Sequence, residues 1–190
     1  SPDCYLAQPA AVIRALATTI PDTIDVYERT PVVRISPVSV GWQVLTSQGS
    51  LTCTDLVLAN NSFIAGLGVA TSNLASVYTY AALTEPLSAS ALGSLGSVRN
   101  WGVLPTHRLG STLRLTVDGR LLIRSLHDLE KEQSEHRVRE ALSLRLRRRF
   151  PQLGDLRFES VWGGAVGFTY NGGLVWGDKQ PGLWVSGGCN

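Results

Sequence analysis

The chain has 190 residues, of which 44% are hydrophobic and 17% charged, and its formal net charge is +2. This composition is typical of a globular protein with one core or one and a half domains, and it excludes a disordered chain. The charge is too small to predict an anionic polymer as partner. No apolar run reaches the roughly 20 residues that cross a bilayer, and no signal segment opens the chain. We therefore expect a cytoplasmic protein without membrane contact.

The cysteines are three in number, scattered, and not spaced as metal ligands: Cys4, Cys53 and Cys189. An odd, scattered set predicts neither a disulfide framework nor a zinc site, so no metal is expected. Methionine is absent, and the chain is expected to be part of a longer protein.

A helix is predicted over residues 5–17, because Pro9 suits a first helical position and apolar residues recur on one side. Three further segments have the composition of short strands: 24–28, 31–35 and 41–46. The last of these is expected to form a hairpin with 51–53, closed at Gln48-Gly49. The first third of the chain thus begins with a helix and continues in strands.

The apolar run at residues 55–59 predicts a strand covered on both faces, although a buried helical segment has the same pattern. Longer polar-apolar alternation follows and predicts antiparallel strands at 77–85, 112–116 and 120–124, the last two joined through Asp118-Gly119. A helix is predicted from about 134 to 150. Its apolar stripe consists of Val138, Ala141, Leu142, Leu146 and Phe150, and Pro151 ends it.

The predicted fold class is therefore α+β. A predominantly antiparallel sheet with a covering helix occupies the middle of the chain, and shorter strand groups lie before and after it.

The last third carries the most specific motif, a Trp-x-Gly strand from Trp162, a Thr169-x-Asn171 turn, and a strand entering Gly187-Gly188. Earlier segments that belong to the same pattern are Thr-Pro-Val-Val at 30–33, the strand ending in Ala59-Asn60, Thr-Glu-Pro-Leu at 84–87 and Arg-Leu-Thr-Val-Asp-Gly-Arg-Leu-Leu at 114–122. Together they resemble the FAD-dependent oxidoreductases of the D-amino-acid oxidase and glycine oxidase superfamily. The pattern is most similar to the γ-glutamylputrescine oxidase-like members.

The resemblance implies a chain that leaves and re-enters an FAD-binding domain. Residues 1–70 and 161–190 would be partial FAD-binding regions, and 71–160 the substrate-binding cap. It implies FAD as cofactor and oxidation of the C–N bond of a small amine or amino acid. The implied cofactor-binding residues are Val32, Val33, Ala59, Asn60, Gly187 and Gly188. The implied substrate-binding residues are Tyr80, Arg114 and Trp162, with no catalytic side chain assigned.

Three departures from the family pattern limit this expectation. The Gly-x-Gly-x-x-Gly fingerprint is absent, so the chain alone is expected to bind FAD poorly. Ile123-Arg124-Ser125 stands where the family has an aromatic residue followed by glycines. Val166 stands where amino-acid oxidases carry a carboxylate-binding arginine, which favours an amine substrate.

Several alternatives remain open at the level of sequence. The chain could be a remnant that serves as an interaction module, or part of an amino-acid dehydrogenase or oxidase whose carboxylate anchor is Arg114. The basic run at 145–149 is compatible with nucleic-acid binding. A solvated helix end explains it with fewer assumptions, so no nucleic-acid partner is expected. Oligomeric state is left unassigned.

Overall fold

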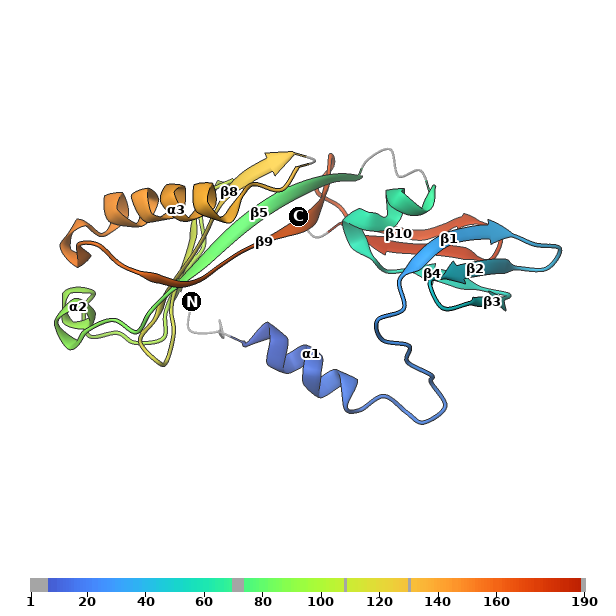
Figure 1. The fold of residues 1–190 in the computed structure, drawn as a ribbon, viewed down its shortest axis with the longest axis horizontal. Coiled ribbons are helices and arrows are strands. Elements are labelled where there is room, and N and C mark those ends of the chain that lie inside the picture. Colours follow the sequence, from blue (N-terminus) through green and yellow to red (C-terminus); the bar gives the residue numbers. More distant parts are fainter. Residues whose placement is uncertain (1–6, 70–73, 108, 130, 189–190) are drawn as a thin grey trace. The chain divides into compact units, whose positions relative to one another are not determined.

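The structure is a computed structural model, and it describes residues 7–69, 74–107, 109–129 and 131–188. The chain divides into two compact units, Ser1–Leu56 and Val57–Asn190. The boundaries expected at residues 70 and 160 both lie inside the second unit. Each unit is described by itself below, and Figure 1 labels its elements.

The first unit contains helix α1 (Pro9–Ala17) and strands β1 (Val32–Pro37), β2 (Trp42–Thr46) and β3 (Ser50–Cys53). Pro9 opens the helix, as predicted. The strands form an antiparallel sheet in the order β1-β2-β3, and the predicted hairpin pairs β2 with β3. Gly41 is required beside this hairpin, because it has φ +86° and a Cβ there would lie 2.0 Å from the Cys53 carbonyl oxygen.

The strand predicted at residues 24–28 does not form, and this segment is irregular. A strand needs a neighbour for its backbone hydrogen bonds. In the described residues the sheet has the order β1-β2-β3, and the segment pairs with the outer edge of neither β1 nor β3. Its β-branched composition favours extended backbone but specifies no partner strand.

The second unit is organised around a five-stranded antiparallel sheet in the order β6-β7-β8-β5-β9. Its strands are β5 (Leu74–Thr84), β6 (Gly102–Val103), β7 (Thr112–Leu115), β8 (Leu121–Leu129) and β9 (Phe158–Thr169). The predicted Asp-Gly hairpin joins β7 to β8. The sheet is antiparallel throughout, as the alternating sequence pattern predicts.

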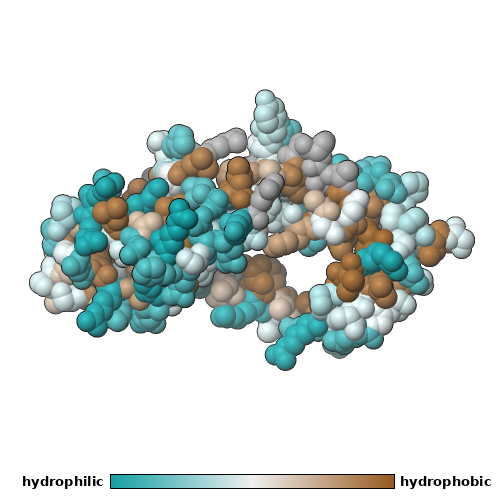
Figure 2. Space-filling view, turned by 45° about the horizontal axis from the view of Figure 1, so that its top comes forward, coloured by the Kyte–Doolittle hydropathy of each residue, from teal (hydrophilic) through white to brown (hydrophobic). Residues whose placement is uncertain are grey.

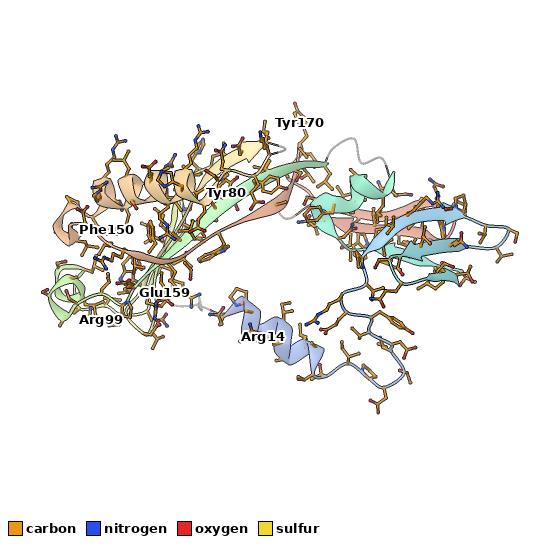
Figure 3. The ribbon with its side chains drawn as sticks, in the orientation of Figure 1. Arg14, Tyr80, Arg99, Phe150, Glu159 and Tyr170 are labelled. Carbon is orange, nitrogen blue, oxygen red and sulfur yellow. The ribbon has the colours of Figure 1, made fainter. Side chains whose placement is uncertain are left out.

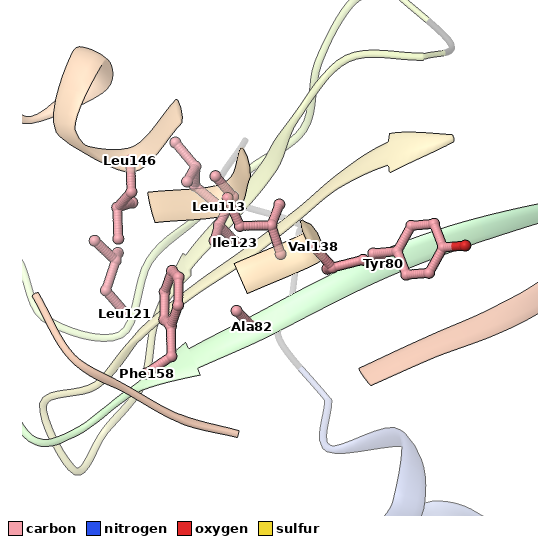
Figure 4. Close-up of a cluster of buried hydrophobic side chains, with 9 residues drawn as sticks. Tyr80, Ala82, Leu113, Leu121, Ile123, Val138, Leu146 and Phe158 are labelled. Atoms are coloured by element: carbon pink, nitrogen blue, oxygen red, sulfur yellow. The ribbon is translucent and has the colours of Figure 1, made fainter. Parts of the chain in front are cut away.

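Helix α3 (Glu135–Arg149) covers one face of this sheet and supplies the core with Val138, Leu142 and Leu146. Figure 4 shows these side chains meeting those of the strands. The sheet contributes Tyr80, Ala82, Leu113, Leu121, Ile123 and Phe158 to the same cluster. The outward side of α3 is rich in charged residues, and the part of the surface where it comes forward is mainly hydrophilic in Figure 2.

A second, three-stranded sheet has the order β10-β11-β4, from β10 (Val175–Gln180), β11 (Leu183–Gly187) and β4 (Leu56–Leu58). Leu183, Val185 and Val175 are buried on one face. Trp176 and Trp184 are 74% and 43% exposed on the other, so this sheet is covered on one face only by the described residues.

Short elements that the sequence analysis did not predict complete the second unit. They are the 3-10 helices η1 (Asn61–Leu67) and η2 (Pro151–Leu153) and helix α2 (Ala89–Ser94). In the described part of the chain, no helix is long and apolar enough to cross a membrane. The same residues contain no cluster of three or more side chains suited to a metal ion.

Candidate functional site

The first candidate region is where strands β4 and β11 end. Asn61 lies three residues beyond β4, and Gly188 directly follows β11. The Gly188 N–H donates a hydrogen bond to Asn61 Oδ1 at 2.9 Å. The carboxyl ends of two neighbouring strands therefore lie together, although 127 residues separate them in sequence. In open α/β sheets, ligands bind outside such strand ends.

Glycine is needed at this strand end for steric reasons. Gly188 has φ +84°, and a Cβ there would lie 2.7 Å from Thr169 Cγ2. Thr169 belongs to the predicted Thr-x-Asn turn, where its hydroxyl donates to the Gly173 carbonyl at 2.6 Å. Asn171 Oδ1 accepts from the Gly173 N–H at 3.1 Å. The turn and the glycines thus form one packed unit, which we call the glycine corner (Asn61, Thr169, Gly187 and Gly188).

The glycine corner is suited to a ligand through its backbone rather than through side chains. Ala59 and Asn60 are exposed, and Gly187 is half-buried. The Gly188 N–H is already donated to Asn61, so in this arrangement it does not point to a ligand. Gly187 and the backbone of Ala59 and Asn60 are therefore the accessible groups of this region. Val32 and Val33, the adenine candidates, are 41% and 61% exposed in the first unit.

The second candidate region is the face of the five-stranded sheet opposite α3, which we call the back face. Directly paired residues of antiparallel strands share a face. Ala81 pairs with both Arg124 and Trp162, and Arg124 pairs with Thr112. The neighbouring row contains Arg114, Leu122, Leu83 and Ser160. Arg114 and Trp162 therefore lie on the same face, as their common assignment requires.

Tyr80 lies on the other face of the sheet. It is 2% exposed in the core beneath α3, and its hydroxyl oxygen accepts a hydrogen bond from the Gln133 N–H at 2.7 Å. Figure 3 shows it between β5 and the start of α3. The three expected substrate residues are thus divided, two on the back face and one in the core.

Arg124 is a back-face residue that the sequence analysis noted only as a departure from the family pattern. Its Nε and Nη2 donate to Thr112 Oγ1 at 3.3 and 2.9 Å, which holds the guanidinium toward β7. Ala81 lies between Arg124 and Trp162 in the same row across the sheet. The backbones of Arg124 and Trp162 are therefore two strand spacings apart, roughly 10 Å. Alternation with the core residues Ile123 and Ser125 was the available signal for this placement.

The positive charge of Arg124 affects the nearby side chain of His127. Burial lowers the pKa of His127, and the positive charges of Arg124 and Arg145 lower it further. Its Nε2 is buried and has no hydrogen-bond partner among the described residues. These surroundings therefore favour the neutral imidazole of His127.

Comparison with known proteins shows which proteins this chain resembles in sequence and fold. No family model matches the chain. The Haemophilus influenzae protein named "Probable oxidoreductase OrdL" is 25% identical over 170 residues, which are 87% of this chain and 38% of that protein. The chain therefore spans less than half the length of the curated relative that it matches.

Three solved structures show the same arrangement of elements. Glycine oxidase from Geobacillus kaustophilus matches with a TM-score of 0.67 and 21% identity, over 85% of this chain and 43% of its own. L-proline dehydrogenase from P. horikoshii gives 0.62 and 18%, over 85% and 44%. Iminodiacetate oxidase from Chelativorans sp. BNC1 gives 0.59 and 15%, over 82% and 42%. The fold expected from the sequence resemblance is thus confirmed: this chain has the fold of a segment of these oxidases and dehydrogenases.

Proposed function

We propose that this chain is part of an FAD-dependent oxidoreductase that oxidises the C–N bond of a small amine or amino acid. The observation that carries the proposal is the glycine corner, where the ends of β4 and β11 meet across 127 residues of sequence. The matching solved structures are named glycine oxidase, L-proline dehydrogenase and iminodiacetate oxidase. When bound, a flavin accepts the hydride equivalent from the carbon next to nitrogen.

The roles proposed for the chain's own residues follow from the two regions. Ala59, Asn60, Gly187 and Gly188 would lie along the cofactor, and Val32 and Val33 would contact its adenine. The back face would bind the substrate. Trp162, 45% exposed, gives it an apolar wall at β9, and half-buried Arg114 lies three strands away on β7, at the basic end of the face and away from the amine. Tyr80 supports the sheet from the core and is left out of the proposed substrate surface.

An amine is the favoured substrate. Val166 occupies the position at which the sequence resemblance expects a carboxylate-binding arginine, and it pairs with Val77 in an apolar part of the sheet. Arg114 and Trp162 lie three strands apart on β7 and β9, roughly 14 Å in the sheet direction. A single small amino acid therefore cannot contact both strand positions, and Arg114 is poorly placed to bind a carboxylate next to a carbon held at Trp162.

The test uses the polypeptide that carries this chain, purified and supplied with FAD. We expect a protein-bound flavin absorption spectrum that is bleached anaerobically by a primary or secondary amine. The α-carboxylated analogue of the same amine is expected to bleach it more slowly. Trp162→Ala is expected to slow bleaching.

Trp184→Ala is the matched control, because Trp184 is 43% exposed but lies on the other sheet. Equal slowing by both tryptophan variants would remove the back face from the proposal. A protein that stays colourless with FAD would overturn the flavoenzyme assignment in favour of a remnant without catalysis.

A further inference from the structure

A pocket that the proposed function does not use lies on the α3 side of the five-stranded sheet, between the second half of α3 and strands β6 and β7. Its volume is about 450 Å³, within the range of small-molecule sites. Its apolar walls are Val103, Pro105, Leu113 and Ile123. The last two are 4% and 1% exposed and belong to the core beneath α3, as Figure 4 shows. The floor of this pocket is therefore formed by side chains of the core.

Three arginines of α3 line the same pocket: Arg145, Arg148 and Arg149. Residues three and four apart share one side of a helix, so Arg145, Arg148 and Arg149 lie on the same side of α3. Arg147 points to another side, where its Nη1 forms an ion pair with Asp155 at 2.8 Å. A solvated, dipole-compensating helix end accounts for Arg147 but does not require the other three to converge on one cavity.

The charges of this pocket are not neutralised by the residues that line it. Its lining contains no carboxylate among the described residues. Arg145 Nη1 donates to Ser125 Oγ at 2.8 Å, and Ser125 Oγ lies 2.8 Å from Ser111 Oγ. Ser125 is fully buried, so one guanidinium is held in place from inside the core. The guanidinium carbon of Arg149 lies 5.9 Å from the Phe150 ring centroid.

We propose that this pocket, the α3 arginine pocket (Ser111, Arg145, Arg148 and Arg149 over Leu113 and Ile123), binds an organic anion that has an apolar body. A carboxylate would accept charge-assisted hydrogen bonds from the guanidinium groups, for which Arg is the preferred donor. The aliphatic part would cover Leu113, Ile123 and Val103. The two requirements together favour such a ligand over a free inorganic anion, which leaves the apolar walls in water, and exclude an amine, which the arginines repel.

In the experiment the full chain is titrated separately with hexanoate, hexylamine and inorganic phosphate. Binding is measured by isothermal titration calorimetry and by ligand-observed NMR. We expect saturable binding of hexanoate, weaker binding of phosphate, and none of hexylamine. Hydrogen bonds to charged groups predict that the double variant Arg148→Ala/Arg149→Ala binds hexanoate roughly tenfold more weakly or worse. Raised salt should weaken binding to the unchanged chain.

Arg137→Ala is the charge-matched control for the single variant Arg148→Ala, which is measured beside the double variant. It removes one positive charge from the exposed side of the same helix, roughly 16 Å from Arg148 along the axis. Binding that falls equally in the control and in the double variant would reduce the proposal to a general field effect. Absence of saturable hexanoate binding, or phosphate binding as tight as hexanoate binding, would overturn it. Flavin binding and bleaching by amines are expected to be unchanged in Arg148→Ala/Arg149→Ala, so the two proposals fail separately.

Discussion

At the scale of single residues, the two candidate regions depend on a few positions that the sequence pattern marks only in part. Gly188 could be predicted from its place after a strand. Its partner Asn61 could not, because a side-chain acceptor 127 residues away leaves no periodic signal. Asn61 itself has φ +50°, a conformation that asparagine adopts more readily than most residues.

Replacement of Gly188 by alanine is expected to destabilise the chain more than the same change at Gly68. Both glycines have positive φ, +84° and +79°, so both variants incur backbone strain of about 1–2 kcal/mol. Only at Gly188 does the new Cβ meet a close neighbour, Thr169 Cγ2 at 2.7 Å, whereas nothing lies within 4 Å at Gly68. Overpacking adds about 1–3 kcal/mol. Urea unfolding of both variants measures the difference, and equal destabilisation would show that the corner is loosely packed.

His127 predicts a pH dependence of stability. Its pKa is lowered in the folded chain by burial, then by Arg124 and Arg145. The unfolded chain therefore binds the proton more tightly, and the stability associated with neutral His127 is present above the unfolded pKa of about 6.5. It is lost as the pH falls through the folded pKa. The urea concentration at the unfolding midpoint should decrease when the pH is lowered from neutral to about 5. This decrease should be smaller in His127→Gln. His136→Gln is the control, since that side chain is 83% exposed on α3. An unchanged pH dependence in His127→Gln would contradict the assignment.

At the scale of elements, local signals were reliable wherever a turn or a helical stripe fixed the structure. The Asp118-Gly119 and Gln48-Gly49 hairpins formed as predicted. Residues 24–28 failed because strand composition specifies no partner. Sheet faces were harder to predict. Tyr78 and Tyr80 alternate, which predicts one shared face, but whether that face is the core depends on where α3 packs. The irregularity of β8 at Leu126, where φ is +64°, could not be predicted, because the sequence has no glycine at that position.

The packing of α3 gives a prediction at this scale. Leu142→Ala should cost about 2–5 kcal/mol of unfolding free energy, because Leu142 is fully buried in the cluster between helix and sheet. Leu144→Ala, on the exposed side of the same helix at 44% exposure, should cost much less. Thermal or chemical unfolding of the pair measures this. Similar losses for both variants would mean that helix propensity, rather than burial, governs the stability contributed by α3.

At the scale of the whole molecule, the family resemblance was predictable because motifs recur in order along nearly the entire chain. The faces and registers that decide a site were not. Arg114 and Trp162 were assigned together from motifs alone, yet their distance depends on the strand order β7-β8-β5-β9, which no local pattern encodes. The α3 arginine pocket was hidden for the same reason. Helix periodicity separates Arg147 from the other arginines of the run, but only the docked helix shows which side lines a pocket.

The bond between Gly188 and Asn61 also bears on how the polypeptide acquires its shape during synthesis. Strand β4 emerges from the ribosome long before its neighbour β11, with 127 residues between the bonded positions. At typical translation speeds that interval is roughly 10 s. During it one edge of β4 waits without a neighbour, and loop closure over such a span is slow. The three-stranded sheet is therefore a late event in biogenesis, and β4 stays vulnerable to aggregation until β11 arrives.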